Sequence, residues 1–137
     1  HISIVVSGMD TDGDGGERKA IDKLMTSLRS LVEETQCRMF VVSHLKRPEK
    51  KGHEEGGQVS LSQLRGSGAI AQLSDMVIGL ERNQQGEQPN ILTVRVLKNR
   101  FSGSVGIGGY LLYNEKTGRL EDLDASDTDT AVTNTDY

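Results

Sequence analysis

The sequence predicts an α/β domain that begins with parallel strands and ends with smaller β elements, and three observations lead to this prediction. Residues 2–7 and 39–43 are short apolar runs with β-branched residues, typical of strands that are buried on both faces. Between them, apolar residues recur at helical spacing over 17–36. A strand, a helix and a strand of these lengths are typical of a right-handed parallel crossover.

The segment between the first run and the helix is an acidic, glycine-rich loop over residues 8–16. Asp14 and Glu17, three positions apart, resemble a helix N-cap and the acid that pairs with it. No role is assigned to the loop itself. The buried face of the helix is predicted to consist of Ile21, Leu24, Met25, Leu28, Leu31 and Val32.

The second half of the chain is predicted to contain shorter elements after a polar, basic loop at 44–58. These elements are one or two short helical turns over 60–73, strands over 76–80, 91–97 and 106–113, a polar loop over 83–90, and a short strand at 119–120 after a turn at 115–118. Beyond residue 121 the composition of Asp, Thr, Ser and Ala provides no core, so we expect disorder there.

Length and charge exclude several classes of protein. The 137 residues correspond to one domain. No apolar run approaches the roughly 20 residues that a bilayer requires, so no membrane partner is expected. The net charge of −4 is unevenly distributed, because residues 121–137 hold six acids and no base. The first 120 residues therefore hold 16 bases against 14 acids, and the overall charge is not that of the working surface.

Two absences also limit the chemistry. The single cysteine, Cys37, and the three histidines show no zinc-ligand spacing, and no metal site is expected in this chain. No Gly-x-x-x-x-Gly-Lys-Ser/Thr phosphate loop occurs, and no acid ends the first apolar run. If the chain acts on ATP, the main binding element lies outside it.

Three groups of polar residues are candidates for chemistry, each with a simpler alternative. His44 follows the second predicted strand, where ligands of open parallel sheets bind, although a lone loop histidine is more often only a surface residue. The bases at 46–51 and Arg65 could contact a phosphate chain or be a solvated surface. Lys98 and Arg100 could reach one anion or form surface ion pairs.

Six motifs in order resemble the C-terminal half of the helicase domain of podovirus (T-seven-like phage) bifunctional primase-helicases. They are HISIVVS at 1–7, SHLK at 43–46, LRGSGA at 64–69, LERNQQG at 80–86, LKNRF at 97–101 and GYLLYN at 109–114. These proteins are ring helicases of the DnaB-like group. The resemblance implies a partial RecA-like P-loop NTPase core that lacks the P-loop half, with a parallel central sheet and added β-hairpins.

The resemblance also implies residue roles. It matches His44 to a γ-phosphate sensor, Arg100 to an arginine finger with Lys98 beside it, and Gln72 to a residue that couples nucleotide state to DNA. It matches Lys46, one of Lys50 and Lys51, Arg65 and Gly66 to DNA-binding loops, and Arg82 and Tyr113 to a pair that sandwiches the nucleotide base. His1 corresponds to the residue after the metal-associated Asp, which would lie upstream with the P-loop and the catalytic Glu.

The function that the resemblance implies is a replicative NTP-dependent helicase that moves on single-stranded DNA as a ring, expected to be a hexamer. We expect Mg²⁺ and an ATP- or dTTP-type nucleotide in the full-length protein, a cytoplasmic location (in the host cell if phage-encoded), and no hydrolysis by this fragment alone. Residues 1–123 would belong to the helicase domain, and 124–137 would be a disordered acidic tail that binds the replicative polymerase. The alternatives are a non-enzymatic protein-binding module and a RecA-type recombinase fragment.

Overall fold

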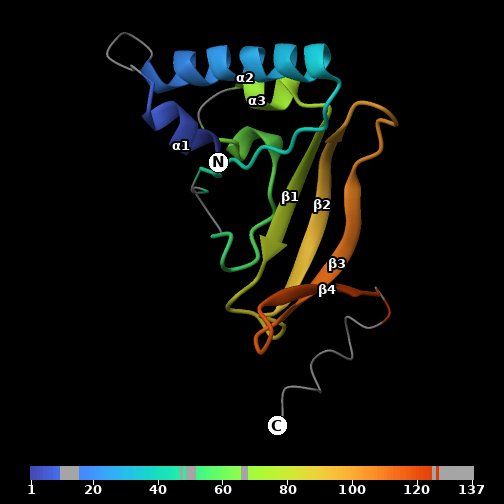
Figure 1. Ribbon diagram of the computed structural model, residues 1–137. Helices are drawn as coiled ribbons and strands as arrows, with labels where there is room; N and C mark the ends of the chain where they lie inside the picture. The colour runs from blue at the N-terminus through green and yellow to red at the C-terminus, as the bar shows by residue number, and fades with distance from the viewer. Residues whose placement is uncertain (10–15, 47, 49–51, 66–67, 125, 127–137) are drawn as a thin grey trace. The chain divides into compact units, whose positions relative to one another are not determined.

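The computed structural model describes residues 1–9, 16–46, 48, 52–65, 68–124 and 126. The chain divides into two compact units. The first unit comprises His1–Lys46 and Leu61–Ser74, and the second comprises Arg47–Ser60 and Asp75–Tyr137. The helices belong to the first unit and the strands to the second (Figure 1).

The first unit is built from four helical segments around one small apolar core. These are α1 (Ile2–Ser7), α2 (Gly16–Thr35), the 3₁₀ helix η1 (Leu61–Gln63) and α3 (Gly68–Leu73). The fully buried members of the core are Ile2, Val6, Ala20, Ile21, Met25 and Ile70. The predicted long helix and the predicted helical turns over 60–73 are therefore confirmed.

Helix α2 has a clear local basis at both ends. Glu17 lies in its first turn, where the partial positive charge of the helix N-terminus favours an acid. At the other end Gln36 adopts a left-handed φ of 54°, and its amide Nε2 donates to the Glu33 carbonyl at 2.7 Å. The predicted N-cap, Asp14, lies outside the described residues.

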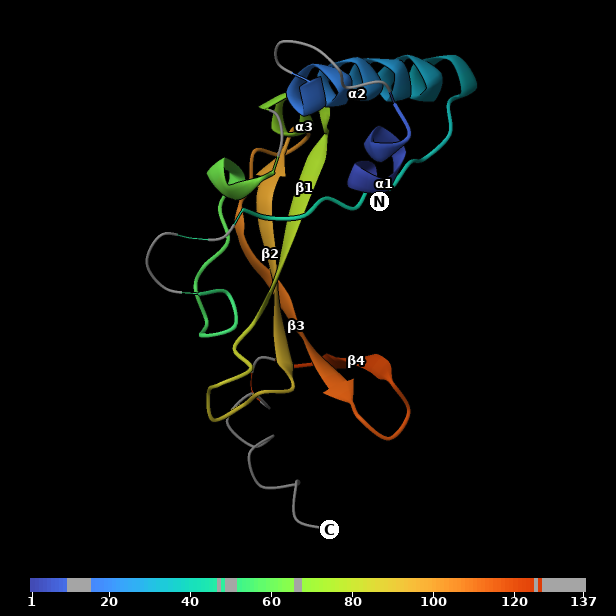
Figure 2. The same cartoon turned by 90° about the vertical axis from the view of Figure 1, so that its left-hand side faces the viewer.

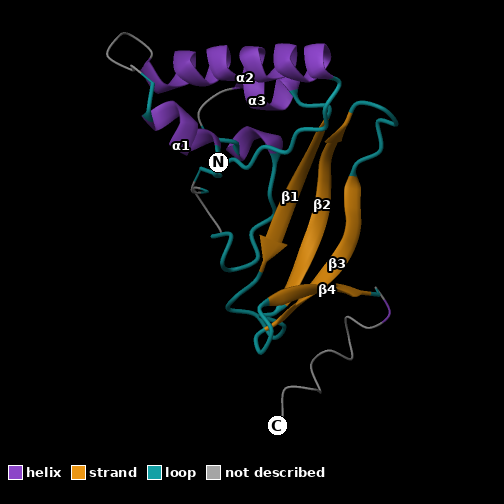
Figure 3. Cartoon of the chain, in the orientation of Figure 1, coloured by secondary structure: helices purple, strands orange, loops and turns teal. Residues whose placement is uncertain are grey.

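Neither strand of the predicted parallel crossover forms. Residues 2–7 are helix α1, and residues 39–43 have no regular structure (Figure 3). One backbone hydrogen bond joins the two runs, from Ile2 N to Val42 O at 2.9 Å. A strand buried on both faces requires a partner on each side, and neither run has one among the described residues. Helical hydrogen bonds instead satisfy the backbone of residues 2–7 locally, and Ile2 and Val6, one turn apart, become buried.

The second unit contains a four-stranded sheet in which every pair is antiparallel, as Figure 2 shows edge-on. The strands are β1 (Met76–Arg82), β2 (Ile91–Asn99), β3 (Gly106–Asn114) and β4 (Arg119–Leu123), in that order across the sheet. All four were predicted as strands, but the predicted parallel central sheet is wrong for these residues. The connections at 83–90, 100–105 and 115–118 are too short for a parallel crossover, which needs a dozen or more residues.

The two faces of this sheet differ in what covers them. On one face, which we call the Glu81 face, Glu81 lies opposite Thr93, and Thr93 lies opposite Tyr110. Residues 52–59 cover this face, because Val59 is buried and Gly79 is so close to it that a Cβ there would approach the Val59 Cγ1 atom to 3.1 Å. The opposite face, the Arg82 face, exposes an apolar row on β1: Met76, Ile78 and Leu80.

Candidate functional site

His44 lies in the first unit and contacts the first residue of the chain. The His44 and His1 rings have centroids 3.9 Å apart and planes tilted by 47°. The His44 residue is exposed, so its ring is accessible to a ligand. Since the resemblance matches His1 to the residue after a metal-associated Asp, this contact brings the predicted phosphate sensor next to the predicted metal side of the site.

A short antiparallel ladder joins the His44 segment to the Arg65 segment. Lys46 N donates to Gln63 O at 2.7 Å, and Arg65 N donates to His44 O at 3.0 Å. Leu45 and Leu64 form the bridge between these two hydrogen bonds. The predicted phosphate sensor and two predicted DNA-binding residues therefore share one piece of backbone structure.

The remaining predicted DNA and coupling residues of this unit are less constrained. The side chains of Lys46 and Arg65 are exposed, and the Arg65 guanidinium lies 4.0 Å from the Glu17 carboxylate. Gln72 is exposed on α3. The predicted DNA-binding residues Lys50, Lys51 and Gly66 lie outside the described residues.

Arg82 and Tyr113, the predicted base-binding pair, meet on the Arg82 face of the sheet. The register places Arg82 opposite Leu92 and Leu92 opposite Leu111, so that Tyr113, two residues further, shares this face. The Arg82 guanidinium carbon lies 5.0 Å from the centroid of the Tyr113 ring, a cation–π contact. The sequence prediction therefore identified two residues that the fold brings together from strands β1 and β3.

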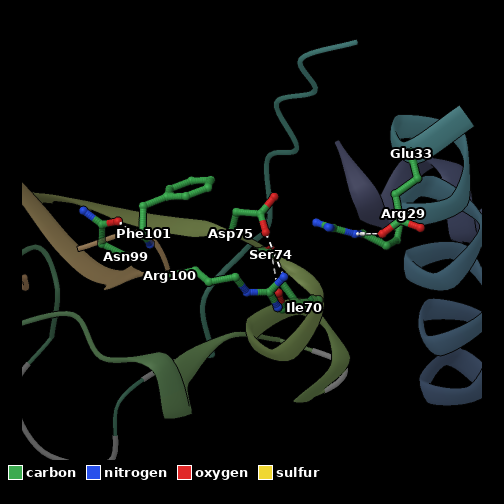
Figure 4. A network of polar contacts seen from close by, with 8 residues as sticks. All are labelled: Arg29, Glu33, Ile70, Ser74, Asp75, Asn99, Arg100 and Phe101. Atoms are coloured by element: carbon green, nitrogen blue, oxygen red, sulfur yellow. Dashed lines mark hydrogen bonds and ion pairs between the residues drawn. The ribbon is translucent and has the colours of Figure 1, made fainter. Parts of the chain in front are cut away.

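Arg100, the predicted arginine finger, follows the end of β2 and forms an ion pair with Asp75. Its Nη1 atom lies 2.9 Å from Asp75 Oδ1, and its backbone N donates to Asp75 O at 2.8 Å. Figure 4 shows the Arg100 side chain directed toward Asp75. This is the surface ion pair that spacing alone also allowed. Lys98 lies opposite Val77 in the β1–β2 ladder.

A less exposed ion pair lies on the Glu81 face. Arg95 binds the Glu81 carboxylate with two hydrogen bonds, of 2.7 and 3.0 Å, and Val59 N donates to the same carboxylate at 2.8 Å. Burial alone would raise the pKa of Glu81, but the hydrogen bonds from Arg95 and Val59 and the charge of Arg95 outweigh burial and lower this pKa below its ordinary value. This carboxylate fixes the end of the basic loop onto the sheet.

An open pocket of about 740 Å³ lies beside this ion pair. Its lining residues are Gly56, Glu81, Arg82, Asn83, Gly86, Glu87, Gln88, Ile91, Thr93 and Tyr110. Asn83 Oδ1 and His53 Nε2 are buried without a hydrogen-bond partner in the described structure. The pocket is continuous with the segment that contains Arg82 and belongs to the same site.

Two kinds of feature are absent from the part of the chain that the structure describes. No three His, Cys, Asp or Glu side chains in the described ranges are placed to hold a metal ion. No helix in the same ranges combines the length and the apolar character needed to cross a membrane. The residues present therefore do not fit a Mg²⁺ site, and no step is derived through a metal here.

Sequence reasoning missed Asp75, Asn90 and the Glu81–Arg95 pair. Glu81 could have been found from the strand pattern, because Val77, Gly79 and Glu81 alternate onto one face and an inward acid requires a partner. Asp75 and Asn90 each precede a strand, and no local pattern indicates that their side chains bind a distant arginine.

Comparison with solved structures identifies the class of this fold. The chain matches a solved structure of a helicase-type ATPase domain with a TM-score of 0.69 at 24% identity, over 84% of this chain and 40% of the other. It matches the structure of a DnaB-like replicative helicase, described together with its interactions with primase, with a TM-score of 0.68 at 24% identity, over 85% of this chain and 28% of the other. The fold is thus that of DnaB-like helicase ATPase domains, an α/β fold of the RecA-like class, which confirms the predicted fold class.

The family follows from the sequence comparisons. The profile of the DnaB-like helicase C-terminal domain matches residues 4–122, and the chain belongs to this family. A DNA helicase/primase of Enterobacteria phage T3 is 56% identical over 122 residues, which is 88% of this chain and 21% of that protein. The chain thus spans about a fifth of the length of this relative. The predicted resemblance to phage primase-helicases is confirmed.

Proposed function

We propose that this chain is the C-terminal part of a replicative helicase that hydrolyses a nucleoside triphosphate to move along single-stranded DNA as a ring. Family membership supports this function over a recombinase fragment or a non-enzymatic module. In this proposal residues 1–123 complete the helicase domain and 124–137 form an acidic tail that binds the replicative polymerase. Mg²⁺, the ATP- or dTTP-type nucleotide, the hexameric ring and the cytoplasmic location are parts of the same proposal.

The observation that carries the proposal is the ladder between residues 44–46 and 63–65. If His44 senses the γ-phosphate, a movement of its backbone also moves Arg65, because Arg65 N is hydrogen-bonded to the His44 carbonyl. The second hydrogen bond, from Lys46 to Gln63, keeps the two segments in register. Loss of the γ-phosphate would then shift two DNA-binding residues together, and Gln72 on α3 would follow from the same segment.

Arg82 and Tyr113 would bind the nucleotide base. A base held between them requires a separation of about 7 Å, since each face needs a contact of about 3.5 Å. The observed distance from the guanidinium carbon to the ring centroid is 5.0 Å. In this proposal the nucleotide-free pair is closed, and the guanidinium withdraws by about 2 Å as the base enters.

Arg100 would act on the nucleotide of a neighbouring subunit, with Lys98 supporting it. Its ion pair with Asp75 does not prevent this role. Both side chains are substantially exposed, 46% for Arg100 and 35% for Asp75, and an exposed pair contributes only about 0–1 kcal/mol. A phosphate group could therefore replace Asp75 as the partner. The chain by itself, without a phosphate loop, is proposed not to hydrolyse nucleotide.

The experiment that tests this function substitutes the proposed finger. In the intact helicase, Arg100→Ala should lower DNA-stimulated hydrolysis by about 10³- to 10⁵-fold, the range for arginine fingers, while nucleotide binding is nearly unchanged. Arg119→Ala is the matched control, because Arg119 is an exposed arginine of β4 that has no role in the proposal. Hydrolysis by Arg100→Ala at the rate of the control variant would contradict the assignment.

A further inference from the structure

Asn90 links both members of the Arg82–Tyr113 pair. It lies immediately before β2, at the end of the sheet where β1 ends and β2 begins (Figure 1). Its side-chain Oδ1 accepts a hydrogen bond from Arg82 Nη2 at 2.8 Å, and its backbone carbonyl accepts one from Tyr113 N at 2.8 Å. One residue therefore holds the guanidinium through its side chain and the tyrosine strand through its backbone.

The remaining contacts of this group restrict the guanidinium further. Pro89 O accepts a hydrogen bond from Arg82 Nε at 2.5 Å, so two adjacent residues bind two different N–H groups of the planar guanidinium. Asn90 Nδ2 donates to Glu115 Oε1 at 3.0 Å, which orients the amide so that its oxygen faces Arg82. The orientation of the guanidinium plane over the Tyr113 ring therefore depends on the Asn90 amide.

The chemistry of the partner is as informative as its position. An amide is neutral, whereas a carboxylate at this position would neutralise the guanidinium. A guanidinium that is oriented by a neutral partner keeps its charge for the π face of an aromatic ring or for a nucleotide. Pre-orienting a long side chain also reduces the conformational entropy that is lost when a ligand binds.

We propose that Asn90 is a positioning residue for base recognition: it presents the Arg82 guanidinium to the nucleotide base in alignment with Tyr113. This inference rests on the proposed function, in which Arg82 and Tyr113 bind the base. Asn90 itself does not touch the nucleotide, so its effect should appear in the binding of the base and not in the binding of the phosphates.

The test uses the full-length helicase with three substitutions and two measurements. Asn90→Ala should raise the KM for the nucleoside triphosphate by about two- to tenfold, the cost of ordering one long side chain, without a change in kcat. Inhibition by inorganic tripolyphosphate, which has no base, should be unchanged. Asn90→Asp should recover most of the wild-type KM, because its carboxylate oxygen also accepts from Arg82. Glu115→Ala, which removes only the third contact, should stay within about twofold of wild type.

Combination with Arg82→Ala separates the two levels of the proposal. If Asn90 acts through Arg82, Asn90→Ala adds no further increase in KM to Arg82→Ala. An unchanged KM in Arg82→Ala would refute the base-binding pair of the proposed function, and the role of Asn90 with it. A raised KM in Arg82→Ala together with a wild-type KM in Asn90→Ala would refute only the role of Asn90. Equal losses in Asn90→Ala and Asn90→Asp, or weaker tripolyphosphate inhibition, would indicate a merely structural role and overturn the inference. If Asn90→Ala does not fold, Asn90→Ser, which is too short to reach Arg82, replaces it.

Discussion

At the scale of single residues, Glu81 shows how one side chain can connect a loop to a sheet. Its side chain is 12% exposed and that of Arg95 is 18% exposed, so neither charge is fully hydrated. The carboxylate accepts hydrogen bonds from both Arg95 and the Val59 backbone. Because charged hydrogen bonds in such surroundings are stronger than surface pairs, Glu81 is the acid in this chain whose loss should be felt most.

Substitution of Glu81 should therefore alter both the stability of this chain and its pH dependence. We expect Glu81→Gln to lower the free energy of unfolding by about 1.5–3 kcal/mol at neutral pH. The pKa of Glu81 is lowered in the folded chain, so its contribution is present above the ordinary pKa of 4.5 and is lost as the pH falls through the lower folded value. The stability difference between wild type and variant should shrink below pH 4.5.

Chemical denaturation between about pH 7 and about pH 3 measures this difference. Glu33→Gln serves as the control, since Glu33 pairs with Arg29 on the surface of α2 and its side chain is 62% exposed. That variant should stay within about 0.5 kcal/mol of wild type throughout. A Glu81→Gln difference that is constant with pH would show that the charge of Glu81 contributes nothing.

At the scale of elements, the sequence predicted the later part of the chain better than its beginning. Strands such as Ile91–Asn99 have polar turns at both ends and partners a few residues away, so local patterns determine them. The run at residues 2–7 has the composition of a buried parallel strand, but composition does not provide a neighbour, and the run forms α1 instead. Elements whose partners are distant in sequence cannot be predicted from local pattern alone.

The same distinction applies to the candidate site. Arg82 and Tyr113 were predicted as a pair, and the strand register explains why they meet. Asn90 and Asp75 were not predicted, because each binds an arginine that only the folded sheet brings near. Motif resemblance thus identifies residues with expected roles, whereas the residues that orient them become visible only in the structure.

The contact between the 52–59 segment and β1 leads to a prediction at this scale. Gly79→Ala would place a Cβ 3.1 Å from Val59 Cγ1 and 3.3 Å from Leu97 Cδ1, so the segment must shift away from the sheet. We expect a loss of about 1–3 kcal/mol in the free energy of unfolding. Gly68→Ala is the control, because its Cβ would meet nothing within 4 Å, and it should be neutral or slightly stabilising. Thermal unfolding of the two variants gives the comparison, and equal midpoints would refute the close contact.

At the scale of the whole molecule, the net charge of −4 combines two opposite contributions. The first 120 residues carry a small excess of bases, and residues 121–137 carry six acids and no base. Among the described cations, Lys46 and Arg65 adjoin one backbone ladder, and Arg82 and Arg100 are held by partners on the sheet. A body that contacts DNA phosphates and a tail of opposite charge would not compete for the same partner.

The tail therefore gives the last prediction. Removal of residues 124–137 from the full-length helicase should leave DNA unwinding unchanged and weaken association with the replicative polymerase, more so at low salt, where charge attraction is less screened. A variant of the same length, with Asp124, Asp127, Asp129 and Asp136 replaced by Asn, separates the effect of charge from that of chain length. Binding to the polymerase measured by surface plasmon resonance should decrease in both variants. Undiminished binding by the deletion variant would remove the docking role, and loss in the deletion variant alone would assign it to the uncharged tail residues.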